Sequence, residues 1–144
     1  GALSPVEALI AGKASVDARN RYGDTALMIA ALNGRLDVAK ALRAAGADVN
    51  PRGWTPLAYA ATGGHDGMVT WLLAQGAAID ARSANGTTAL MMAAREGRYD
   101  TALLLLDKGA DVNARNENNM SALDFAQRNN DTRLVARLRA AGAR

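Results

Sequence analysis

The chain of 144 residues contains no cysteine and a single histidine, His65. The absence of cysteine excludes a disulfide framework, a zinc–thiolate site and a cysteine nucleophile, and it fits a reducing or an oxidising compartment equally well. One histidine beside scattered carboxylates matches no metal-site spacing, because metal binding needs several convergent ligands. We therefore predict no catalytic residue, no metal site and no cofactor, and a chain that is not an enzyme.

Long apolar runs are also absent, and aromatic residues make up only 4% of the chain. No stretch of eighteen apolar residues occurs, which excludes a transmembrane helix. A hydrophobic fraction of 49% nevertheless argues against disorder. The length suits one domain over residues 1–144, able to bury about two thirds of its unfolded surface. We expect a soluble protein of the cytoplasm or the periplasm.

The chain shows internal repetition around four turn residues, which are spaced 30, 33 and 33 residues apart. The turn residues are Gly23, Gly53, Gly86 and Asn119. A Thr or Ser follows each after one intervening residue: Thr25, Thr55, Thr88 and Ser121. A leucine comes two positions later, at Leu27, Leu57, Leu90 and Leu123. A period of this size is typical of a stacked helical array.

Each repeat can be interpreted as a pair of helices. The turn residue supplies a positive φ, and the Thr or Ser is a good N-cap for the helix that follows. Alanine pairs at 30/31, 60/61 and 93/94 leave room for neighbouring helices to approach closely. Gly34, Gly64, Gly97 and Asn130 are expected to end the first helix in a left-handed conformation. The loop residues Asn50, Asp80 and Asn113 are expected to make local backbone hydrogen bonds.

These residues resemble the ankyrin repeat family. The match rests on Gly53-Trp-Thr-Pro-Leu57, Ala60-Ala61, Gly64-His65, Leu72-Leu73 and Gly109-Ala-Asp-Val-Asn-Ala114. The resemblance implies an all-α solenoid of antiparallel helix pairs, with loops that project as fingers and a concave face that usually binds a protein. It implies an N-terminal half-unit at 1–19, repeats at 20–50, 51–82 and 83–115, and a closing repeat at 116–144. His65 then has a structural role.

Two departures from the family pattern stand out. The family's histidine after Pro-Leu is replaced by Met28, Ala58, Met91 and Asp124, so its hydrogen bond is absent. The second finger is also truncated. Gly53 comes three positions after Asn50, whereas the corresponding step in the other fingers is six positions. The truncation is either a tolerated loop trim with Trp54 partly packed, or a notch in the concave wall with Trp54 as an aromatic anchor.

The family's contact positions, carried over residue by residue, fall on the finger tips and on the exposed side of each first helix. They are Arg21, Tyr22, Asp24, Leu32, Asn33, Arg52, Trp54, Thr62, Ala84, Asn85, Thr87, Arg95, Glu96, Glu117, Asn118, Met120, Arg128 and Asn129. Interface cores are enriched in aromatics, Met and Arg, so Tyr22 and Trp54 are the predicted anchors. Core packing is the expected role of Tyr59, Trp71, Met92 and Phe125.

The net charge of +3 is unevenly spread, because residues 128–144 carry five Arg and one Asp. One interpretation is a polar cap on the terminal repeat, which must face water. The other is a contact with an anionic partner, although no aromatics interleave with these arginines as a nucleic-acid stacking platform would require.

Two functions therefore remain open. The first is a protein-binding adaptor, inhibitor or protector, expected to be a monomer; small Arg- and Ala-rich chains of this kind resemble free-standing bacterial ankyrin proteins, for which masking or protecting an enzyme is plausible. The alternative is an anion- or nucleic-acid-binding scaffold that acts through the C-terminal arginines.

Overall fold

The structure, a computed structural model, describes residues 16–144, and the helices in this range form four successive pairs. The first helix of each pair is α2 (Ala26–Leu32), α4 (Pro56–Gly63), α6 (Ala89–Arg95) or α8 (Ala122–Arg128). The second is α3 (Leu36–Ala44), α5 (Asp66–Ala74), α7 (Tyr99–Asp107) or α9 (Thr132–Ala140). The predicted half-unit at 1–19 lies outside the described residues, apart from its last four.

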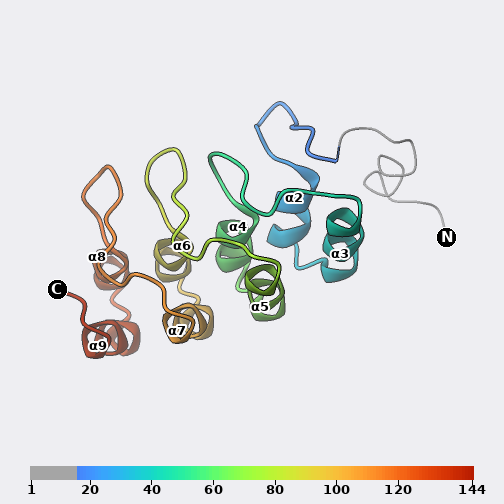
Figure 1. Cartoon of the computed structure of the whole chain (residues 1–144). Coiled ribbons are helices and arrows are strands. Elements are labelled where there is room, and N and C mark those ends of the chain that lie inside the picture. The colour runs from blue at the N-terminus through green and yellow to red at the C-terminus, as the bar shows by residue number, and fades with distance from the viewer. Residues whose placement is uncertain (1–15) are drawn as a thin grey trace.

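The pairs stack side by side into two rows (Figure 1). The first helices pack against one another in the order α2, α4, α6 and α8, and each also packs against its own second helix. Looped fingers project from the first-helix row on the side away from the second helices. This arrangement confirms the predicted all-α repeat solenoid.

The predicted turn and capping residues begin and end the first helices. The N-caps Thr25, Thr55, Thr88 and Ser121 each accept a hydrogen bond from the backbone N–H three residues further on. Pro56 occupies the first helical position, where its missing N–H leaves nothing unsatisfied. Beyond the helix ends, φ is positive at Gly34, Gly64, Gly97 and Asn130, as the sequence predicted.

The core follows the repeat period. The leucines at 27, 57, 90 and 123 are at most 4% exposed, and the alanine pairs behind them are equally buried. The second helices contribute Leu42, Leu72, Leu105 and Leu138, all fully buried. Because the alanines carry only a methyl group, adjacent first helices pack closely and the core runs without a break through the stack.

One ladder of hydrogen bonds joins the loops that follow the second helices. Asp17 Oδ1 accepts from the Asp48 N–H at 2.9 Å, and Asp80 Oδ1 accepts from the Asp111 N–H at 2.8 Å. Asn50 and Asn113 accept from Ala78 and Arg144 in the same way. The sequence predicted local bonds for these side chains, and that prediction was wrong in this respect: stacking places each loop beside its successor, so the bonds run between repeats.

A second set of hydrogen bonds joins the C-terminal end of a first helix to the following repeat. His65 Nε2 lies 2.9 Å from the Leu32 carbonyl oxygen, and Arg98 Nε donates to the Thr62 carbonyl oxygen at 3.0 Å. The His65 ring also fills the space beside two glycines, since a Cβ added at Gly34 or Gly63 would lie within 2.6 Å of it. These contacts support the structural role expected of His65.

Candidate functional site

Three of the four fingers fold in the same way, as tight turns closed by backbone hydrogen bonds. The N–H groups of Gly23, Gly86 and Asn119 donate to the carbonyl oxygens three residues earlier, each at 2.9 Å. All three donors have positive φ. In the first and fourth fingers, Asn20 and Asn116 accept further backbone bonds through their side-chain oxygens. The fingers are therefore ordered platforms.

The second finger differs in length and in its links to its neighbours. The connection 45–55 is three residues shorter than 75–88 and 108–121. Arg19 of the first finger donates to the Arg52 carbonyl oxygen at 3.0 Å, and Arg82 of the third donates to the Arg115 carbonyl oxygen at 2.6 Å. Within residues 16–144, no hydrogen bond joins Arg52 to the third finger in the corresponding way. The hydrogen bonds that join neighbouring fingers, which we call the finger ladder, are therefore interrupted between the second finger and the third.

Trp54 lies beside this interruption and stacks on Tyr59 of helix α4. The two rings are 6.1 Å apart between centroids and 6° from parallel. The Tyr59 hydroxyl donates to the Asp24 carboxylate in the preceding repeat. Burial, assisted by this hydrogen bond and by the negative charge of Asp24, raises the pKa of Tyr59 to about 12. Trp54 is half-buried, so it is partly packed and partly available to a partner.

The side chains on the outer side of the first helices form two rows across the stack. The upper row, four residues after each N-cap, is Ile29, Tyr59, Met92 and Phe125. The lower row, seven residues after each N-cap, is Leu32, Thr62, Arg95 and Arg128. Since α2, α4, α6 and α8 lie side by side (Figure 1), each row crosses all four repeats.

Most of the residues predicted to contact a partner are accessible. Exposed are Arg21, Tyr22, Leu32, Asn33, Arg52, Ala84, Arg95, Glu96, Glu117, Asn118, Arg128 and Asn129. Half-buried are Asp24, Trp54, Thr62, Asn85 and Met120. Thr87 is only 4% exposed, which contradicts its predicted place on the surface. Its N–H bonds to Ser83 Oγ and Asn85 Oδ1, and this turn folds the threonine inward.

Two residues that the sequence analysis did not place at the site belong there. Ile29 is 39% exposed in the same phase as Tyr59. Tyr59 packs against the core, as predicted, and in addition links Trp54 to Asp24. Ile29 could have been identified from the sequence, because it occupies the same position in its repeat as Tyr59 does in the next one. Of the other predicted core residues, Met92 is buried, while Trp71 and Phe125 are half-buried against the core.

Tyr22, Ile29, Leu32, Trp54 and Tyr59 together form a surface that we call the aromatic patch. Tyr22 is 73% exposed, and the Arg21 guanidinium lies 5.0 Å from its ring centroid. Tyr22, Ile29 and Leu32 are the exposed large hydrophobic residues of the described chain, and all three lie in the first described repeat. Large apolar side chains left exposed within one repeat make this surface a candidate binding site.

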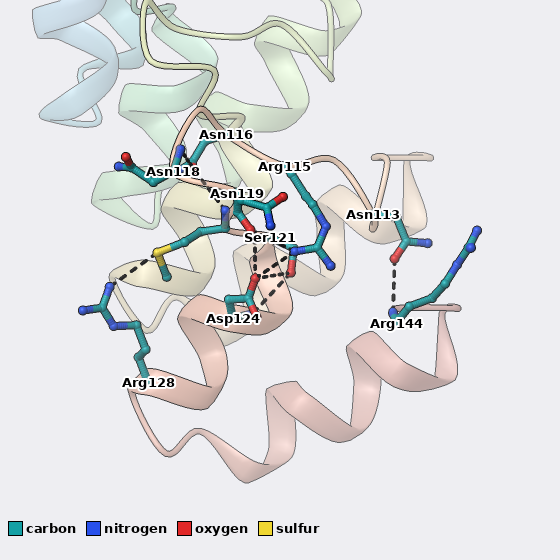
Figure 2. Close-up of polar contacts among 10 residues, drawn as sticks. Asn113, Arg115, Asn116, Asn118, Asn119, Ser121, Asp124, Arg128 and Arg144 are labelled. Atoms are coloured by element: carbon teal, nitrogen blue, oxygen red, sulfur yellow. Dashed lines mark hydrogen bonds and ion pairs between the residues drawn. The ribbon is translucent and has the colours of Figure 1, made fainter.

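Polar contacts join the fourth finger to the start of helix α8 (Figure 2). Asp124, at the family's histidine position, accepts from the Ser121 N–H at 2.8 Å and lies 3.3 Å from Arg115. At the same position in the first repeat, Met28 Sδ accepts from the Thr25 N–H. Other side chains therefore replace the missing histidine bond in these two repeats.

Three of the five C-terminal arginines, Arg133, Arg137 and Arg139, lie on the outer helix α9, of which only Leu134 and Leu138 are buried. The Arg133 guanidinium lies 4.1 Å from the ring centroid of Tyr99, an aromatic contact that the sequence spacing did not reveal. This arrangement supports the polar cap interpretation, because one arginine is already stacked within the fold.

Comparison with known proteins assigns the family. A family model described as ankyrin repeats (3 copies) matches residues 1–52, 45–116 and 76–144. These matches span the whole sequence, so the chain belongs to the ankyrin repeat family.

Two curated relatives share part of the chain. Protein phosphatase 1 regulatory subunit 27 of Mus musculus is 38% identical over 79 residues, which is 53% of this chain and 51% of the relative. Ankyrin repeat and KH domain-containing protein mask-1 of Caenorhabditis elegans is 38% identical over 91 residues, 60% of this chain but 4% of the relative. The chain thus matches about half of the first and a small part of the second.

No helix in residues 16–144 is long and apolar enough to cross a membrane.

Proposed function

We propose that this ankyrin repeat chain is a non-enzymatic binding module that holds another protein on the aromatic patch. The observation that carries the proposal is the exposure of Tyr22, Ile29 and Leu32, the large hydrophobic side chains left accessible in the described residues, all within one repeat. Tyrosine and tryptophan are enriched among residues that dominate binding energies. Trp54 and Tyr59 extend this apolar surface onto the second repeat.

Regulation of a partner enzyme, by inhibition or protection, is the use we propose for this binding. The mouse relative is named as a regulatory subunit of a phosphatase, and a rigid repeat stack can mask a surface without performing chemistry. The alternative is an anionic partner on the α9 arginines. It is supported by the exposed Arg137 and Arg139 and by the charge of residues 128–144.

The test is affinity capture with wild type and with Tyr22→Ala/Leu32→Ala, followed by titration of the purified captured protein. Both side chains are exposed, so we expect the free energy of unfolding to fall by less than about 1 kcal/mol. Binding should weaken by about 30-fold or more, which corresponds to about 2 kcal/mol for the loss of a central anchor.

Arg137→Ala/Arg139→Ala is the control, because it removes two exposed side chains from helix α9 in the other row. It should bind the captured protein as wild type does. The opposite result, in which this control loses the partner and the patch variant keeps it, would move the binding surface to the second helices.

Salt distinguishes the two functions. Contacts between several arginines and nucleic acid should weaken by about two orders of magnitude or more between 50 and 200 mM salt, whereas an apolar contact should change little. Nucleic acid retained equally by wild type and the patch variant, and lost at 200 mM salt, would establish the alternative.

A further inference from the structure

The lower row of the first-helix face changes character along the stack. It begins with Leu32 on α2, continues with Thr62 on α4, and ends with Arg95 and Arg128 on α6 and α8. The same helical position is therefore apolar at one end of the row and cationic at the other. A partner that crosses all four helices meets the two environments in a fixed order and at a fixed distance.

The cationic end forms an open pocket lined by Arg95, Glu96, Phe125, Arg128 and Asn129, which we call the arginine pocket. The Arg95 side chain is 59% exposed, and its nearest carboxylate, on Glu96, is 3.9 Å away. Arg128 contacts the Met120 sulfur at 3.4 Å (Figure 2), and a thioether is a weak acceptor. Arg95 therefore has only this long contact with Glu96, and Arg128 has no carboxylate at ion-pair distance within residues 16–144.

Other carboxylates near this end are already engaged. Asp124 receives hydrogen bonds from Arg115 and Ser121 (Figure 2). Asn129 donates to the carbonyl oxygens of Ala94 and Arg95 at 3.0 and 2.8 Å, which fixes the end of α6 beneath the pocket. Two cations and one anion line the pocket, so it carries a net charge of about +1 at neutral pH.

We infer that the partner of the proposed function carries an Asp or Glu carboxylate that binds Arg95 and Arg128 while an apolar side chain of the same partner occupies the aromatic patch. This inference rests on the proposed function. A carboxylate matches the pocket because it carries one negative charge and accepts the paired N–H groups of a guanidinium. The half-buried Phe125 also lines the pocket and offers an apolar contact beside the carboxylate.

The geometry also sets the separation of the two partner groups. Leu32 and Arg95 end helices that are two steps apart in the row, and packed helix axes lie about 8–10 Å apart, so the groups are about 16–20 Å apart. An extended segment covers that distance in about five or six residues. A helical segment covers it in about 11–13 residues.

The test is selection from two displayed libraries, one of random 16-residue peptides and one of a helical scaffold with a randomised surface. The wild-type chain should enrich sequences with an apolar residue and an Asp or Glu at the predicted separation. Replacing that acid by its amide in a selected peptide should weaken binding about tenfold, the size expected for one charge-assisted hydrogen bond. The Arg95→Glu/Arg128→Glu chain should instead enrich Lys or Arg at the same separation.

Arg137→Glu/Arg139→Glu is the matched control, since it makes the same charge change on the exposed side of α9. It should select the same acidic sequences as wild type. The milder Arg95→Ala/Arg128→Ala variant should lose the acidic preference without gaining a basic one. Thermal unfolding of all three variants should show that they remain folded.

Three outcomes would overturn the inference. Selected sequences that need Tyr22 and Leu32 but show no acidic preference would refute it and leave the proposed function standing. Sequences that are indifferent to Tyr22→Ala/Leu32→Ala would refute both. A labelled 20-nucleotide single strand that binds wild type, but neither pocket variant, and displaces the selected peptides would assign the pocket to phosphate.

Discussion

The two ends of the first-helix row share an interior and differ in their surface. Leu27 on α2 is 1% exposed and Leu123 on α8 is 4% exposed, and each lies two residues after an N-cap that accepts from the backbone N–H three residues further on. On the outer side, Ile29 and Leu32 on α2 correspond to Phe125 and Arg128 on α8. The repeat thus keeps the residues that build the stack and varies those on the proposed binding face.

The hydrogen bonds between neighbouring fingers also differ along the stack. The outer finger pairs are joined by Arg19 and by Arg82, whereas the corresponding bond between the second and third fingers is absent from the described structure. The loops at the base remain joined there, by Asn50 and Ala78. The truncation therefore loosens the finger end of the middle junction and leaves the helical core continuous.

The largest predicted effect tests whether the two halves share one core. Leu57→Ala and Leu90→Ala should each lower the free energy of unfolding by about 2–5 kcal/mol, because each leaves a cavity in a fully packed interior. Urea unfolding measures both values. A loss below about 1 kcal/mol for one of them would show that its half is less tightly packed.

The next effect concerns Trp54 and decides how much of the aromatic patch is structural. Trp54→Ala should cost about 1–2 kcal/mol, because it removes the stacking contact with Tyr59 as well as part of the buried area. Tyr22→Ala, at 73% exposure, should cost less than about 0.5 kcal/mol. Equal losses in thermal unfolding would mean that Tyr22 is held by the fold and is not a free anchor.

A smaller effect tests the interrupted finger ladder. Arg82→Ala should cost about 1 kcal/mol through the lost bond to the Arg115 carbonyl oxygen, and Arg52→Ala less than about 0.5 kcal/mol. Amide hydrogen exchange should show faster exchange at Gly53 than at Gly86, whose N–H bonds to Ser83. Protection of the second finger equal to that of the third would contradict the weak junction.

The smallest effect is a pH dependence that arises from Tyr59. Its pKa is raised from 10.0 to about 12 in the folded chain, so the folded state holds the phenolic proton more tightly than the unfolded state. The resulting stability is fully present below pH 10 and is lost as the pH rises through 12. The difference in stability between wild type and Tyr59→Phe should therefore shrink between pH 10 and pH 12, as urea unfolding at each pH would measure.

The fold could be predicted because it depends on local, periodic features. Turn glycines, threonine caps and leucines recur every 30–33 residues, and each feature acts within one repeat or on its immediate neighbour. Residues on the candidate surface could be predicted only in part. Thr87 was misplaced because its burial depends on two side-chain bonds within the finger. Tyr59 packs against the core as predicted, but its bond to Asp24 was missed because it joins residues 35 positions apart.

By itself, the amino-acid sequence determined the family, the helix boundaries, the buried phase and the truncated finger. Each of these follows from backbone preferences and hydrophobic period, which act over a few residues. Only the tertiary structure decided which neighbours the loop and finger side chains bond to, how far Trp54 is buried, and that Arg95, Phe125 and Arg128 line one pocket. These features arise because stacking brings residues about thirty positions apart into contact, at distances that no local pattern encodes.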